Sequence, residues 1–81
     1  IRLWPNPTAQ DLVVSVRVKK TTDANVMMVD MSGRIISTMT ARLLNGENQL
    51  QIKADKIPAG AYTLIIVAED GSKMQGKFIK Q

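Results

Sequence analysis

The sequence predicts an all-β fold, an immunoglobulin-like antiparallel β-sandwich of about seven short strands. Short segments in which apolar residues recur at every second position run through the 81 residues, and this is the pattern of half-buried strands. Turn-forming residues separate these segments at intervals of about ten positions. No stretch has the apolar period of an amphipathic helix, and the absence of cysteine excludes the disulfide of true immunoglobulin domains.

The first strand is expected at residues 1–4, directly before two prolines, Pro5 and Pro7. Each proline fixes φ and lacks a backbone donor, so this segment is expected to be an edge strand or a linker joint. We expect Trp4 to plug the end of the core and not to act as a ligand platform, because a lone tryptophan is usually packed. The next strand, residues 11–20, is expected to be half-exposed, with four apolar side chains on one face: Leu12, Val14, Val16 and Val18.

The polar segment 20–25 predicts a turn, and a strand with apolar residues on both faces follows it at residues 26–31. Ser32 and Gly33 then reverse the chain, so residues 26–39 are expected to form a hairpin with its tip at Asp30–Gly33. Residues 41–44 either extend the second strand of this hairpin or begin a new strand. The pattern leaves both alternatives open.

A further turn is expected at Asn45–Asn48, because Asn-Gly favours a positive φ. The segment after it, residues 49–53, alternates with Leu50 and Ile52 inward. Glu69–Ser72 predicts a tight turn, and Lys73–Lys80 is expected to be the last strand. This basic strand is expected to face a negatively charged surface and to offer unpaired backbone groups to a partner or to another copy of the chain.

The most specific local structure lies in residues 56–67. Pro58 fixes φ and Gly60 is expected to take a positive φ, so the chain should reverse just before Tyr62. From Tyr62 onward, both faces of the strand carry apolar residues. This pattern predicts a central strand that is covered on both sides.

The composition argues against several functions. The chain has 11 lysine and arginine residues against 7 acidic residues, a formal net charge of +4. The charges are scattered and there are only one Trp, one Tyr and one Phe, so we expect a solvated surface and no nucleic-acid site. Histidine and cysteine are both absent, which removes the usual general base, the usual thiol nucleophile and the usual zinc ligands. We therefore expect neither enzymatic activity nor a cofactor.

The remaining polar residues are expected to serve structure. Four aspartates lack the spacing of a calcium loop, and we expect each to bond to its own turn: Asp23, Asp30, Asp55 and Asp70. Surface ion pairs are expected between Asp30 and Arg34 and between Asp55 and Lys56. The five methionines are expected to fill gaps in a thin core: Met27, Met28, Met31, Met39 and Met74.

No apolar run is long enough for a membrane helix, and no signal peptide opens the sequence. Because the first residue is Ile1 and not methionine, we expect the chain to begin inside a longer polypeptide. Any export signal would then lie upstream.

Six blocks occur in an order that resembles a known family. They are Trp4-Pro5-Asn6-Pro7, the alternating strand after Asp11, Asp30-Met31-Ser32-Gly33-Arg34, Gly46-x-Asn48-x-Leu50-x-Ile52, Ile57-Pro58-Ala59-Gly60-x-Tyr62-x-Leu64 and Lys77-Phe78-Ile79-Lys80. Together, over essentially the whole chain, they resemble the type A C-terminal sorting domain of the type IX (Por) secretion system of Bacteroidetes. Trp4 stands where the family usually has tyrosine, and Ile57 where it often has leucine. Both differences keep size and apolarity.

The resemblance implies that residues 1–81 are a single sorting domain, cut or released from a larger secreted protein. It implies partners: the outer-membrane type IX translocon with its shuttle protein, and a sortase-like cysteine peptidase. This peptidase would cut at or before Ile1 as the cargo is attached to anionic lipopolysaccharide, although a minority of such domains stay attached. The route would be through the periplasm to the outer-membrane surface or the medium. The residues that would carry the signal are Pro58, Ala59, Gly60, Tyr62, Leu64, Gly71, Lys77, Phe78, Ile79 and Lys80.

The alternative hypothesis is a non-catalytic adhesion or carbohydrate-binding module of a secreted enzyme. One Trp, one Tyr and one Phe make a poor platform for sugar rings, and Tyr62 is expected in the core. The sorting signal is therefore the favoured interpretation.

Overall fold

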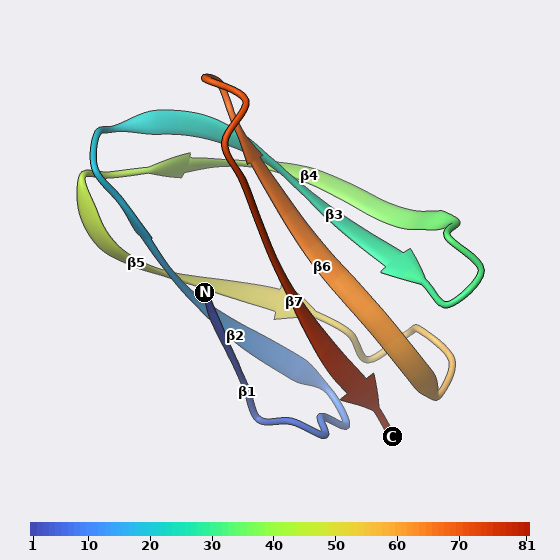
Figure 1. Ribbon diagram of the computed structural model, residues 1–81. Coiled ribbons are helices and arrows are strands. Elements are labelled where there is room, and N and C mark those ends of the chain that lie inside the picture. Colours follow the sequence, from blue (N-terminus) through green and yellow to red (C-terminus); the bar gives the residue numbers. More distant parts are fainter.

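The computed structural model describes residues 1–81 as seven β-strands in two sheets packed face to face (Figure 1). The strands are β1 (Arg2–Trp4), β2 (Asp11–Val18), β3 (Thr22–Asp30), β4 (Ile35–Leu43), β5 (Gly46–Lys53), β6 (Gly60–Ala68) and β7 (Lys73–Lys80). One sheet has the order β1-β2-β5 and the other β4-β3-β6-β7, and all neighbouring strands are antiparallel. The predicted β-sandwich is confirmed. The structure contains no helix that could cross a membrane.

The core lies between the two sheets, because alternate residues of each strand point inward. Leu12, Val14 and Val16 of β2 are buried, as the alternation predicts. They pack against inward side chains of the other sheet, chiefly Val26, Met28, Leu64, Ile66 and Phe78. Residues between these positions lie on the outer faces, and several of them, such as Arg17 and Lys77, are exposed.

The starts of β3 and β5 differ from the prediction. Residues 22–25, expected as a turn, begin β3 and pair with β4, and residues 24 and 25 also pair with β6. Ala24 among them is buried, so its inward position outweighs the turn propensity of its polar neighbours. Residues 41–43 extend β4, which resolves the alternative that the pattern left open. Only residues 44 and 45 then remain for the turn before β5, which was expected at Asn45–Asn48. The predicted hairpin tip at Asp30–Gly33 is confirmed.

β6 is a central strand, as predicted, with β3 and β7 on its two edges. Only one of its faces is covered by the other sheet, so the expectation of cover on both sides is wrong. Tyr62, Leu64 and Ile66 are buried in the core. Outer residues such as Thr63 and Ile65 are half-buried, because only their neighbours in the same sheet shield them.

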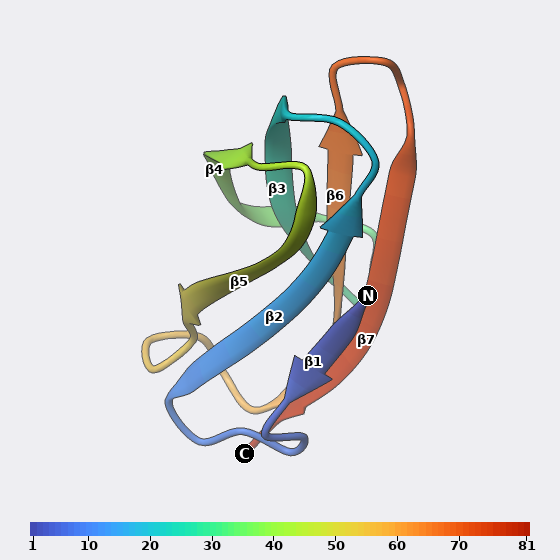
Figure 2. The ribbon, with the colours of Figure 1, turned by 90° about the vertical axis from the view of Figure 1, so that its left-hand side faces the viewer.

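The plug at the β1 end of the core is Leu3, and the prediction that Trp4 fills this place is wrong. Leu3 packs against the core, whereas Trp4 is half-buried on the other face of β1, with the Arg2 guanidinium 4.9 Å from its ring centre. β1 lies beside β7 (Figure 2), and a Cβ at Gly76 would overlap with Leu3 Cδ1. Gly76 therefore allows the two sheets to approach closely at this point.

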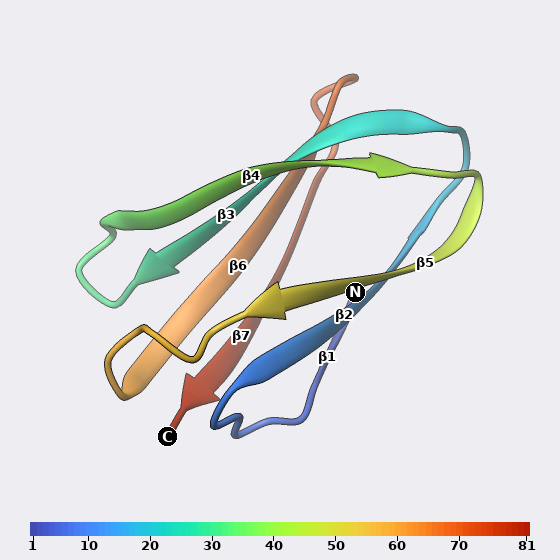
Figure 3. The ribbon, with the colours of Figure 1, turned by 180° about the vertical axis from the view of Figure 1, so that it is seen from behind.

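The methionines do not all fill the core. Met28 is buried in the core and Met74 packs against it, as expected, whereas Met27 lies opposite Ile65 on the outer face of its sheet. The expectation is wrong for Met31, which is 84% exposed, and for Met39, which is 39% exposed. Met39 lies opposite Val26 and so faces inward, but β5 diverges from β4 here and leaves it uncovered (Figure 3).

Replacing Leu64 by alanine is expected to lower the free energy of unfolding by about 2–5 kcal/mol, since the change leaves a cavity in a close-packed core. Leu64 is 1% exposed. Urea denaturation followed by circular dichroism measures the change. The matched control is Thr63→Ala on the outer face, which should cost less than about 1 kcal/mol. Equal losses in the two variants would contradict the assignment of the inner face.

Candidate functional site

Sequence blocks that are far apart in the chain meet at one end of the four-stranded sheet. β6 and β7 pair in a register that places Gly60 opposite Lys80 and Tyr62 opposite Phe78. The segments 58–64 and 77–80 are therefore direct neighbours. Asn6, from the proline-containing block, lies on the other side of β7 and bonds to its backbone.

The turn at Pro58 is attached to the core by Tyr62. The Tyr62 ring stacks on Phe78, with 5.6 Å between ring centroids and 23° between the ring planes. Its hydroxyl donates a hydrogen bond to the carbonyl oxygen of Pro58 at 2.5 Å. Both rings are buried, so they hold the turn from within and offer little surface to a partner.

Lys80 does not lie on the exposed face where the basic last strand was expected to present it. It is only 7% exposed, and its Nζ donates to the carbonyl oxygen of Ile57 at 3.2 Å. The long apolar stem of lysine explains why the residue can be covered while its amine bonds at the rim. Lys73 and Lys77 remain exposed.

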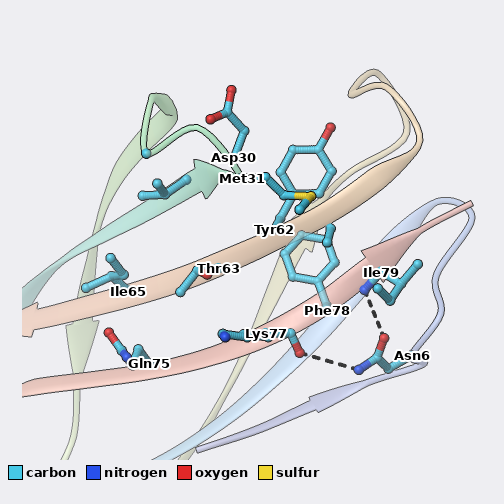
Figure 4. A pocket seen from close by; sticks show the side chains of 13 residues that line it. Asn6, Asp30, Met31, Tyr62, Thr63, Ile65, Gln75, Lys77, Phe78 and Ile79 are labelled. Carbon is cyan, nitrogen blue, oxygen red and sulfur yellow. Dashed lines mark hydrogen bonds between the residues drawn. The ribbon is translucent and has the colours of Figure 1, made fainter.

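The C-terminal half of the β7 edge is not free, although an unpaired edge was predicted. The backbone N–H of Ile79 donates to Asn6 Oδ1 at 2.9 Å, and Asn6 Nδ2 donates to the carbonyl oxygen of Lys77 at 3.4 Å (Figure 4). Thr8 N–H donates to Ile79 O at 2.8 Å, and Gln81 N–H donates to Thr8 O at 2.8 Å. The segment Asn6–Thr8 therefore acts as a clasp over the end of β7.

A hollow opens beside this clasp on the outer face of the sheet (Figure 4). Its lining includes Asn6, Asp30, Met31, Ala61, Lys77 and Ile79, and we call it the outer hollow. Apolar side chains dominate, and two of them, Met31 and Ile79, are 84% and 47% exposed. The hollow thus combines an exposed apolar surface with one cation and one carboxylate at its rim.

Asp30 serves its own hairpin tip, as predicted. Its carboxylate accepts hydrogen bonds from Ser32 Oγ at 2.7 Å, from Ser32 N–H at 3.0 Å and from Arg34 N–H at 3.0 Å. These hydrogen bonds lower the pKa of Asp30 below its ordinary value of 3.8, and the bond from the Ser32 hydroxyl has the largest effect. The predicted ion pair with Arg34 is present, at 3.3 Å.

The other aspartates follow the prediction only in part. Asp70 accepts a hydrogen bond from Ser72 N–H within its turn, at 2.8 Å. Asp23 lies in a strand and pairs with Arg42 at 3.0 Å. Asp55 forms no ion pair with Lys56, so that expectation is wrong. No group of three or more acidic side chains is placed to hold a metal ion.

The ten residues expected to carry a signal fall into two groups. The exposed members are Pro58, Ala59, Gly60, Gly71, Lys77 and Ile79, and the buried members are Tyr62, Leu64, Phe78 and Lys80. Gly71 is separate from the rest, because it lies in the turn at the far end of the β6–β7 hairpin. The sequence prediction omitted Asn6 and Met31. A polar residue between two prolines, and a methionine next to a turn, are the signals that could have indicated them.

Comparison with protein families gives one match. The family model described as the secretion system C-terminal sorting domain matches residues 2–81. The match therefore includes every strand and every residue of the outer hollow. No curated protein matches the sequence.

Gly60→Val is expected to lower the free energy of unfolding by about 1–3 kcal/mol, as measured by urea denaturation. Gly60 has the predicted positive φ, +156°, and a Cβ there would come no closer than 3.9 Å to Tyr62, so the cost arises from the backbone and not from crowding. The control is Ala59→Val at the preceding exposed position, where no positive φ is required. An unchanged stability of Gly60→Val would contradict a glycine requirement in this turn.

Asp30→Asn is expected to weaken the dependence of stability on acid pH. Since the pKa of Asp30 is lowered in the folded state, its stabilising contribution is fully present above its ordinary pKa of 3.8 and is lost as the pH falls through the lower folded value. The native domain should therefore lose melting temperature below about pH 4 more steeply than the variant. Asp55→Asn, which changes a carboxylate without a bond of this kind, serves as control and should keep the native slope.

Proposed function

Because the chain belongs to the family of secretion system C-terminal sorting domains, we propose that the outer-membrane type IX translocon and its shuttle protein recognise the folded surface around the outer hollow. As a sorting domain of the Por (type IX) system, the chain is a non-catalytic targeting signal of an exported protein.

The observation that carries the proposal is the meeting of separate sequence blocks at one end of the sandwich. Gly60 lies opposite Lys80 and Ala61 opposite Ile79, and Asn6 bonds to the same stretch of β7. In an unfolded chain these blocks would be separated by long segments. A receptor that requires them together would accept only a folded domain.

The buried and exposed members of the motif have different roles in this proposal. Tyr62, Leu64 and Phe78 set the shape from inside, because their side chains are in the core. Lys77 and Ile79 contact the receptor, because they line the outer hollow and are exposed. An exposed apolar surface rimmed by polar residues is typical of a protein-binding site.

Removal of the domain by a sortase-like cysteine peptidase also belongs to the proposal. Ile1 precedes the first strand and is 46% exposed. A cut at or before Ile1 would therefore release residues 1–81 as an intact sandwich from a larger secreted protein. This position is compatible with recognition of the folded domain before cleavage.

Carbohydrate binding is disfavoured by the positions of the aromatic rings. Tyr62 and Phe78 are buried, and Arg2 lies over the ring of Trp4. No pair of free ring faces is available to stack on a sugar.

An export assay tests the proposal. A fluorescent protein directed to the periplasm and fused in front of residues 1–81 should reach the surface of cells that possess the type IX system. Surface fluorescence should fall about tenfold or more in a Lys77→Glu, Ile79→Ser variant, which removes two exposed contacts of the outer hollow.

The matched control is Lys53→Glu, Gln51→Ser, two exposed changes on β5 in the other sheet. It has the same change in charge and should be exported like the native domain. Circular dichroism of both variants separates export from folding. Periplasmic retention of the native fusion would overturn the proposed function, and normal export of the β7 variant would exclude the outer hollow as the recognised surface.

A further inference from the structure

A second surface lies where the two sheets are open to solvent, between β2 and the first half of β7. β1 has only three residues and pairs with β2 from Val13 to Ser15. Val16, Arg17 and Val18 therefore have β5 on one side and no strand on the other. Figure 2 shows β1 between the lower parts of β2 and β7, with no strand between their upper parts.

The facing edge of β7 is also unpaired along this stretch. The N–H and C=O of Ile79 point away from β6, because they bond to Asn6 and Thr8. Backbone orientation repeats at every second residue of an antiparallel strand. The N–H and C=O groups of Lys73 and Gln75 therefore also point away from β6, and the clasp does not reach them.

A hollow lies between these two open edges. Its apolar part comes from Val18, Ala68 and Met74, and its rim carries Arg17, Lys19 and Lys20. We call this the basic slot. It shares no lining residue with the outer hollow, although Gln75, whose backbone belongs to the open edge, lines that hollow next to Met74.

The charges around the basic slot are largely unneutralised. None of the lysines of the chain forms a salt bridge, and Arg17 bonds to Glu47 at the surface, where both side chains are more than half exposed. The one acid that lines the slot, Asp70, accepts a hydrogen bond within its own turn and lies near enough to Lys20 to interact with its charge, but it forms no salt bridge. Lys73 adds a further exposed cation beside Met74.

We infer that the basic slot is a docking site for an extended, acidic peptide segment of a partner protein, which adds as a strand to the free edge of β7. Main-chain hydrogen bonds to Lys73 and Gln75 would give affinity, as in other cases of strand addition. Side chains of the added strand would alternate: apolar ones inward against Met74, and acidic ones outward beside Lys73.

The charge pattern favours an acidic peptide over a second copy of the chain or a nucleic acid. A second copy of the chain would place the lysines of one β7 beside those of the other, and like charges in directly opposite positions destabilise a strand pair. A nucleic acid would satisfy the cations but could not supply peptide groups to the edge, and no aromatic side chain lines the slot to stack on bases. If the proposed function holds, the partner is a component of the secretion machinery. Binding of an acidic strand to the basic slot does not otherwise depend on that function.

Binding of a defined peptide to the isolated domain, residues 1–81, tests the inference. The probe is a fluorescein-labelled peptide in which glutamate and valine alternate over about eight residues. The anisotropy should rise to saturation as the domain is added, and hydrogen exchange should slow at the amides of Lys73 and Gln75. A peptide with lysine in place of glutamate should not bind.

Two variants of the domain locate the site. Lys20→Glu, Lys73→Glu should weaken binding about tenfold or more, whereas the control Lys53→Glu, Lys56→Glu, with equal charge and equally exposed positions at the other end, should not. Gln75→Pro removes an edge donor that points to solvent, so it should reduce binding while the domain still melts cooperatively.

Several results would overturn the inference. They are absence of binding up to about 1 mM, equal loss in the control variant, protection of outer-hollow residues without protection of Lys73, and equally tight binding of single-stranded DNA. The export assay is scored separately. Peptide binding without export would reject the proposed function and support the basic slot as a docking site. Export without peptide binding would support the proposed function and reject the docking site.

Discussion

The structure depends on how the last strand is held. β7 bonds to β6 along its whole length, and the clasp from Asn6 to Thr8 covers the other side of its C-terminal half. Phe78 enters the core from this strand with 1% exposure. A small domain buries only a modest share of its surface and has little stability to spare. The last residues of the chain therefore contribute to the sheet, to the core and to the contact between the two sheets at once.

This arrangement links the signal to folding. Lys80 reaches across to the carbonyl of Ile57, and Tyr62 reaches back to the carbonyl of Pro58, so two side chains hold the same turn from two strands. The turn keeps its shape only while both strands are in register. In the proposed recognition, a mutation of a buried member would act through loss of this shape and not through a lost contact with the receptor.

Prediction from the sequence succeeded where the alternation of apolar and polar residues was strong. The inward set of β2 and the tip of the β3–β4 hairpin were predicted because local pattern and turn chemistry agree there. Prediction failed where contacts between residues distant in the sequence determine which side chains are buried. Whether Leu3 or Trp4 plugs the core depends on which face of β1 meets Gly76, and the burial of Lys80 depends on a carbonyl that is 23 residues away in the chain. The bonds of Asn6 to β7 are likewise contacts between the two ends of the sequence.

The outer hollow and the basic slot have different structural origins. The outer hollow is built from the segments that meet through β6 and β7, so its shape follows from the pairing that folding requires. The basic slot exists because β1 is short and the clasp ends at Lys77, which leaves two strand edges open. Open edges expose a small protein to aggregation, and exposed lysines beside an edge counteract that risk. Lysines that repel another basic edge attract an acidic strand, so the charge that prevents self-association can also select a partner.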